Sequence, residues 1–181
     1  MPDGAGPDAR DLGILHKYLV SPASRVALVL GKALSAGLRG LSQAVIIYLL
    51  SLLLHVDLRF TPAAMLGVLA AVVLASGAFA TLSVMVAALV KTRERVMGIG
   101  QVLTMPLFFA SNAIYPVALM PGWLRVLASI NPLTYQVDAL RALMIQGGAS
   151  TYGLGVDFAV LTAVLAVFVP VASRLYPSLA V

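Results

Sequence analysis

The amino-acid sequence predicts an all-α, polytopic membrane protein whose helices cross a lipid bilayer. Hydrophobic residues make up 61% of the 181 positions and charged residues only 10%, so the chain has more apolar surface than one soluble core of this length can bury. The apolar residues form four long runs, which match the length needed to cross a hydrocarbon layer of about 30 Å. The chain contains no cysteine, which excludes disulfides and thiolate metal sites.

The first predicted element is a polar leader, residues 1–11, which lacks the apolar core of a signal peptide. Residues 12–32 mix basic and apolar positions, and this pattern predicts an amphipathic segment along the cytoplasmic face of the membrane. Proline disfavours helix at the residue before it and is tolerated in the first turn of a helix. We therefore expect two short helices that meet near Ser21, next to Pro22.

Four transmembrane spans are predicted from the apolar runs. They cover about residues 36–56, 62–90, 96–117 and 155–175. The second run contains no charged residue, and at about 1.5 Å of rise per residue it has length to spare for a bilayer crossing. Pro116 is expected to end the third helix near Tyr115, because proline interrupts the helical pattern.

The basic residues predict the orientation of the spans. They gather before the first span, between the second and third, and after the fourth: Lys17, Arg25, Lys32, Lys91, Arg93, Arg95 and Arg174. The opposite side carries fewer basic residues, so the positive-inside rule puts both termini in the cytoplasm. Because the basic residues are scattered at the ends of apolar runs, the net charge of +5 indicates membrane anchoring and no nucleic-acid partner.

Small and polar residues inside the spans allow two interpretations each. Gly67, Ala71 and Ala75 recur at every fourth position, which either brings helices close together or arises by chance in an alanine-rich chain. Three polar residues lie in the third span: Gln101, Ser111 and Asn112. Their side chains either bond to neighbouring helices and backbone or line a pathway through the membrane.

Groups that catalysis or ion coupling would require are missing from the apolar cores of the spans. An ion-coupled carrier usually needs an ionisable group in the bundle interior, yet no Asp or Glu lies inside the apolar runs when the fourth is taken as Phe158 to Ala172. His16 and His55 are expected at opposite membrane edges, and no HExxH, GxSxG or acidic pair occurs. The sequence therefore disfavours an intramembrane enzyme and predicts no metal site.

The segment before the last span predicts a re-entrant helical hairpin on the extracytoplasmic side. After Pro116 and Pro121 interrupt the helical pattern, a short amphipathic helix follows, with Trp123 suited to the membrane interface. Asn131 then has the character of an N-cap, with Pro132 as the first residue of a second helix.

An apolar stripe and a charged pair are predicted on opposite sides of this second helix. The stripe consists of Leu133, Val137, Leu140 and Met144. Asp138 and Arg141 are three residues apart and are expected to pair on the other side. The pair either only keeps the hairpin soluble or latches an outer gate in a partly dehydrated setting.

Two stretches resemble a known family. LVSPASRVALVLGK, before the first span, and IYPVALMPGWLRVLASINPLTYQVDALRAL, before the last, are similar to the membrane subunit of type-2 ABC exporters, the family of the daunorubicin-resistance and nodulation-factor permeases. The resemblance covers about residues 12–175, so residues 12–181 are expected to form a type-2 permease domain. Members of this family normally carry six spans, and this sequence resembles their C-terminal four.

The resemblance implies a role for named residues. A contact with a partner ATPase is implied for Ser21, Pro22, Arg25, Gly31, Lys32, Lys91, Arg93 and Arg95. An extracytoplasmic gate is implied for Asn131, Pro132, Leu133, Thr134, Tyr135, Asp138 and Arg141. It also implies a permease homodimer in a bacterial-type inner membrane, with ATP and Mg²⁺ held by the ATPase and no cofactor bound by this chain.

Two classes of function remain open, and a third is disfavoured. The chain is expected to be the permease subunit of an exporter for drugs, lipids or glycolipid-like molecules. The alternative is a non-transporting remnant or assembly partner of such a permease, since two spans of the family pattern are missing. An intramembrane enzyme is disfavoured by the absent chemistry.

Overall fold

The computed structural model describes residues 25–90 and 93–175. Within these ranges the chain is helical, which confirms the predicted all-α class. The elements are α2 (Arg25–Leu53), α3 (Pro62–Leu89), α4 (Arg93–Phe109), the 3-10 turn η1 (Val117–Leu119), α5 (Gly122–Ile130), α6 (Pro132–Met144) and α7 (Leu154–Leu175). The polar leader and the helix junction predicted near Ser21 lie outside the described residues.

Helix α2 corrects the predicted boundary of the first span. It runs without interruption from Arg25 to Leu53, so residues 25–32 form its first turns and no separate helix along the membrane face. No proline occurs between these ends, and the apolar residues continue the helix through the predicted boundary. The helix stops where His55 adopts the left-handed conformation, with a φ of 55°.

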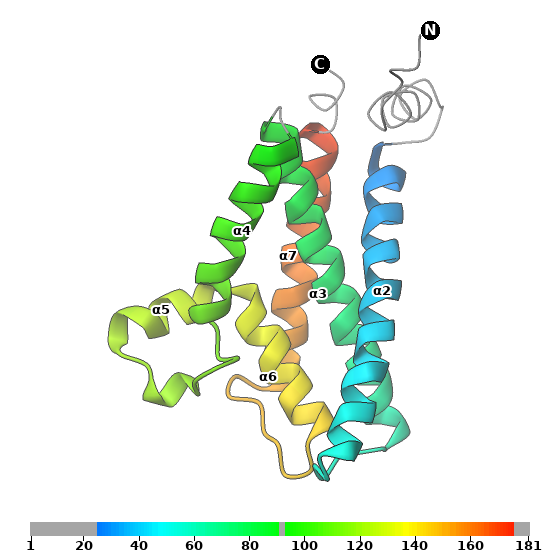
Figure 1. Ribbon diagram of the computed structural model, residues 1–181, viewed down its shortest axis with the longest axis vertical. Coiled ribbons are helices and arrows are strands. Elements are labelled where there is room, and N and C mark those ends of the chain that lie inside the picture. Colours follow the sequence, from blue (N-terminus) through cyan, green and yellow to red (C-terminus); the bar gives the residue numbers. More distant parts are fainter. Residues whose placement is uncertain (1–24, 91–92, 176–181) are drawn as a thin grey trace, which may run out of the picture.

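Three described helices are long and apolar enough to cross a membrane: Val26–Leu53, Pro62–Leu89 and Leu154–Leu175. The third predicted span is different, because α4 has only 17 residues and ends at Phe109, not near Tyr115. The amide of Ser111 bonds to the carbonyl of Phe108 in place of continuing the α-helical pattern. Figure 1 shows α4 running from one end of the bundle to about its middle, and α6 continuing from there to the opposite end.

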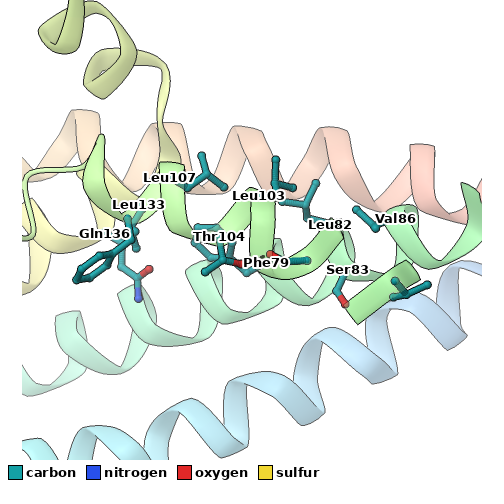
Figure 2. A pocket seen from close by; sticks show the side chains of 12 residues that line it. Phe79, Leu82, Ser83, Val86, Leu103, Thr104, Leu107, Leu133 and Gln136 are labelled. Carbon is teal, nitrogen blue, oxygen red and sulfur yellow. Dashed lines mark hydrogen bonds between the residues drawn. The ribbon is translucent and has the colours of Figure 1, made fainter. Parts of the chain in front are cut away.

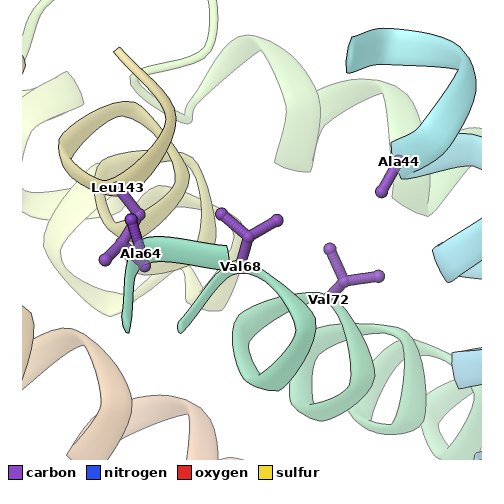
Figure 3. Packing of buried hydrophobic residues seen from close by; sticks show 5 residues of the cluster. All are labelled: Ala44, Ala64, Val68, Val72 and Leu143. Atoms are coloured by element: carbon purple, nitrogen blue, oxygen red, sulfur yellow. The ribbon is translucent and has the colours of Figure 1, made fainter. Parts of the chain in front are cut away.

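Helix α3 is the centre of the bundle, and the small-residue stripe explains its close packing. Ala71 and Ala75 are completely buried, and a Cβ atom at Gly67 would lie 2.9 Å from a methyl group of Leu143 on α6. Ala75 also packs with Leu161 of α7. Figure 3 shows the neighbouring cluster, to which α3 contributes Ala64, Val68 and Val72. Ala44 of α2 and Leu143 of α6 complete it. The stripe is therefore a packing surface inside the chain.

Replacing Gly40 with leucine is expected to disrupt the close packing of α2 against α3. A Cβ atom at Gly40 would lie 2.5 Å from Ser76 Oγ and 2.9 Å from Val72 Cγ1, so these side chains must turn away or the two helices must move apart to admit a leucine. We expect a loss of about 2–3 kcal/mol, measured as a lower melting temperature in detergent. Gly31→Leu is the matched control, because the same helix has open space there. Equal melting temperatures for the two variants would contradict the close contact.

Candidate functional site

Asn131 joins α4 to α6 and confirms the predicted N-cap. Its Oδ1 accepts a hydrogen bond from the amide of Leu133 at 3.0 Å, and Pro132 is the first residue of α6. Its Nδ2 donates to the carbonyl of Leu107 at 2.6 Å, which lies in the last turn of α4, where helix carbonyls lack partners in their own helix. A single buried side chain therefore fixes the start of one helix to the end of another.

Helix α6 turns a different face inward from the one predicted. Its buried residues are Thr134, Tyr135, Asp138, Ala139, Ala142 and Leu143, whereas the predicted stripe of Leu133, Val137, Leu140 and Met144 is only half-buried. Of the two settings left open for the charged pair, the burial of Asp138 excludes the fully solvated one. In this bundle the polar face of α6 is covered by the loop between α6 and α7, which supplies hydrogen bonds that lipid could not.

Asp138 is the centre of this covered face, and its carboxylate is 0% exposed. Its Oδ1 accepts from Asn112 Nδ2 and Thr151 Oγ1, both at 3.1 Å. Its Oδ2 accepts from the amides of Thr151 at 2.6 Å and Tyr152 at 3.2 Å, and Ser150 Oγ lies 3.1 Å away. The carboxylate thus ties the chain after α4 and the loop before α7 to the middle of α6.

The predicted ion pair between Asp138 and Arg141 does not form in the part of the chain that the structure describes. The guanidinium of Arg141 donates to the backbone carbonyl of Asn112 at 2.9 Å, while Asp138 accepts from the side chain of the same asparagine. The two charged residues therefore act on a shared neighbour. Together they hold the segment that follows α4.

Asp157, in the first turn of α7, was missed as a site residue by the sequence analysis. It falls at the start of the fourth predicted span, just before the apolar core from Phe158, and it is 0% exposed. Its Oδ2 lies 2.7 Å from Ser150 Oγ, the hydroxyl that also approaches Asp138. The available signal was the stretch GGASTYG before α7, since glycine, serine and threonine together indicate a turn rich in hydrogen-bond donors.

The other predicted hairpin and pathway residues lie around this centre. The hydroxyl of Tyr135 donates to the carbonyl of Ser129 on α5 at 2.5 Å, and Thr134 is buried beside it. Ser111 is buried and its hydroxyl donates to the carbonyl of Phe108 at 2.7 Å. Asn112 and Ser111 thus bond to a neighbouring helix or to backbone, whereas Gln101 is exposed on α4.

The residues predicted to contact an ATPase fall at the other end of the bundle. Ser21, Pro22 and Lys91 lie outside the described residues. Helices α2 and α4 begin at Arg25 and Arg93, and Figure 1 shows both starts at the same end, next to the end of α7. Gly31, Lys32 and Arg95 are exposed there. The predicted coupling residues and the Asp138 centre are therefore at opposite ends of the described bundle.

A pocket of about 430 Å³ lies between α3, α4 and α6. Figure 2 shows its mainly apolar walls, to which α3 contributes Phe79 and Leu82 and α4 contributes Leu103 and Leu107. Ser83, Thr104 and Gln136 add polar groups. Of the predicted site residues only Leu133 lines this pocket: Gln101, Ser111 and Asn112 do not. An apolar cavity with a few polar groups suits a molecule that is mostly apolar.

Comparisons with known proteins give the chain a family. The ABC-2 type transporter family matches residues 9–145. The transport permease ycf38 of Cyanophora paradoxa is 30% identical over 135 residues, which are 74% of this chain and 46% of that protein. The daunorubicin resistance ABC transporter permease protein DrrB1 of Streptomyces coeruleorubidus is 36% identical over 83 residues, 46% of this chain and 29% of that protein.

A third relative, nodulation protein J of Bradyrhizobium diazoefficiens, is 30% identical over 94 residues, which are 52% of this chain and 36% of that protein. The chain thus spans less than half the length of these curated relatives. No solved structure matches it. Because the family match extends from residue 9 through α2, α3, α4, α5 and α6, the chain belongs to the ABC-2 type transporter family as a membrane permease domain.

Proposed function

We propose that this chain is the transmembrane permease part of an ATP-driven ABC exporter that moves drug, lipid or glycolipid-like substrates outward. The observation that carries the proposal is the pocket of about 430 Å³ between α3, α4 and α6, because small-molecule sites are mostly apolar cavities of about 300–1,000 Å³. The names of two relatives refer to daunorubicin resistance and to nodulation. Both names support the proposal that a permease of this family carries a substrate across the membrane.

The proposal includes the partners and the orientation of the chain. A separate ABC ATPase, holding ATP and Mg²⁺, contacts the end of the bundle where α2 and α4 begin, and this chain binds no cofactor. Exposed basic residues at that end, such as Lys32 and Arg95, support a cytoplasmic position. Both termini are then cytoplasmic, and two permeases associate as a homodimer in the inner membrane.

ATP-dependent transport tests this function. The protein is co-expressed with an ABC ATPase of the same genome, and daunorubicin uptake into inside-out vesicles is measured with ATP and with a non-hydrolysable analogue. We expect the ATPase to co-purify with the protein and uptake to require ATP hydrolysis. Co-purification without uptake of daunorubicin or a labelled lipid would favour the second candidate, a non-transporting assembly partner.

Filling the pocket is expected to reduce transport without unfolding the protein. Gly100 lines the pocket, and a Cβ atom there meets nothing within 4 Å, so Gly100→Leu adds a side chain to free space. We expect uptake to fall about tenfold, equivalent to about 1.4 kcal/mol of binding, at an unchanged melting temperature. Gly98→Leu, on the same helix but outside this pocket, also enters open space and is the control. Equal loss in both variants would remove the pocket from the pathway.

A further inference from the structure

Ser150 Oγ has three close polar neighbours, and together they use its full hydrogen-bonding capacity. It lies 2.7 Å from the amide of Gly153, 2.7 Å from Asp157 Oδ2 and 3.1 Å from Asp138 Oδ2. A serine hydroxyl has one hydrogen to donate and two lone pairs to accept. Gly153 takes one lone pair. One hydrogen cannot serve two ionised carboxylates fully, whereas a hydrogen on one carboxyl group completes both contacts as hydrogen bonds.

Asp138 cannot be the residue that supplies this hydrogen. Both of its oxygens already accept from N–H groups: Oδ1 from Asn112 Nδ2, and Oδ2 from the amides of Thr151 and Tyr152. A hydrogen on either oxygen would face a donor. The hydroxyl of Ser150 therefore donates to Asp138 and has a lone pair left for Asp157.

Asp157 has the environment of a neutral carboxylic acid. It is 0% exposed, and its Oδ1 has no hydrogen-bond partner. An ionised carboxylate in this position would be a buried charge with one unpartnered oxygen, which is unfavourable. A neutral acid that donates through Oδ2 leaves only a weaker acceptor at Oδ1.

Among the described residues, no basic side chain forms an ion pair with Asp138 or Asp157 that could neutralise them in place of a proton. On α6 the nearest cation, Arg141, donates to the carbonyl of Asn112 and forms no ion pair with Asp138 or Asp157. The rings of Tyr135 on α6 and Tyr152 in the loop are in tilted contact, with their centroids 5.1 Å apart. Helix α3, which packs against both α6 and α7, contains no titratable side chain between Pro62 and Leu89.

We propose that Asp138 and Asp157 form a buried proton-binding pair, in which Asp157 Oδ2 carries the hydrogen and donates it to Ser150 Oγ, while Ser150 donates to the ionised Asp138. The proton joins α7 to the α6–α7 loop. Loss of this proton leaves two negative charges on either side of one hydroxyl, so the loop around Ser150 is released from α7. The pair is then a pH-sensitive latch, whatever substrate the permease carries.

The first test detects the hydrogen itself. Infrared difference spectroscopy on the purified protein in nanodiscs records the carbonyl stretch of protonated carboxylic acids at neutral pH. We expect one such band in the parent protein, its loss in Asp157→Asn, and its retention in Asp57→Asn, because Asp57 is exposed on the α2–α3 loop. Absence of a band that depends on Asp157 would overturn the shared proton.

The second test uses stability against pH. A folded state that holds a proton which the unfolded state has released loses stability as the pH rises. The melting temperature of the parent is therefore expected to fall as the pH rises above the range in which an unfolded aspartate releases its proton. The melting temperature of Asp157→Asn should not change over the same pH range, because the amide group of Asn donates to Ser150 at every pH. The Asp57→Asn control should follow the parent.

Two outcomes would contradict the latch. One is a pH profile of Asp157→Asn that falls as steeply as that of the parent. The other is a melting temperature that rises when sodium replaces choline at constant ionic strength and does not fall with pH, which would assign the buried carboxylates to a metal cation. A second variant, Asp138→Asn, keeps the test informative: its amide must face an N–H donor in either orientation, so it should destabilise the protein at every pH.

Discussion

Replacing Asp138 with alanine is expected to lower the free energy of unfolding by about 3–5 kcal/mol. The change removes the acceptor of three N–H groups, on Asn112, Thr151 and Tyr152, and each buried donor left without a partner costs about 1–3 kcal/mol. The contributions are not simply additive, because these donors share one acceptor. Denaturation with sodium dodecyl sulfate, followed by circular dichroism, measures the loss.

The control for Asp138→Ala is Asp57→Ala, since Asp57 is an exposed acid on the α2–α3 loop. Its stability should remain within about 0.5 kcal/mol of the parent. The charge exchange Asp138→Arg with Arg141→Asp should not restore stability, because arginine has no acceptor for the loop amides. A fully stable Asp138→Ala variant, or rescue by the exchange, would show that the carboxylate does not organise this end of the bundle.

Replacing Gly148 with alanine is expected to have the next largest effect, about 3 kcal/mol. A Cβ atom at this position would collide with the backbone carbonyl oxygen of Arg141 and lie 3.1 Å from that of Ile145. Backbone atoms at the end of α6 cannot rotate away as a side chain can, so the turn must open. This displaces the loop that supplies Thr151 and Tyr152 to Asp138.

Gly155→Ala is the matched control for Gly148→Ala. It is the same substitution in the first turn of α7, where a Cβ atom meets nothing within 4 Å. Alanine favours helix over glycine by about 0.5–1 kcal/mol, so this variant should be neutral or slightly more stable. Thermal unfolding in detergent compares the two. A Gly148→Ala variant as stable as Gly155→Ala would contradict the turn geometry.

Local sequence patterns predicted those features that depend on neighbouring residues. The N-cap at Asn131 with Pro132 behind it and the helical class follow from spacing and residue type, and the structure confirms them. For the small residues of α3 the spacing left two interpretations open, and the structure shows close packing. The end of α4 was predicted about six positions too late, near Tyr115, because the helix stops at Phe109, before Pro116 is reached. There the bonding of Ser111 to Phe108, and not a proline, ends the helix.

The buried centre at Asp138 could not be predicted in the same way. Its partners come from positions 112, 150, 151 and 152, and no periodicity along α6 indicates which loop will cover a polar face. An i, i+3 spacing of opposite charges is compatible with an exposed pair, so the pattern favoured pairing of Asp138 with Arg141. In the structure, hydrogen bonds to residues far away in the sequence hold the two side chains apart from each other. Asp157 was missed for the same reason, since Ser150 is its partner through the fold.

The donors on Asp138 also set an order for biosynthesis. Asn112 precedes Asp138 in the chain, but Thr151 and Tyr152 follow it by 13 and 14 positions. Until those residues leave the ribosome, the carboxylate has only part of its hydrogen bonds and is held in water by its own hydration. The carboxylate of Asp138 therefore has its full set of hydrogen-bond donors only after the α6–α7 loop has been made.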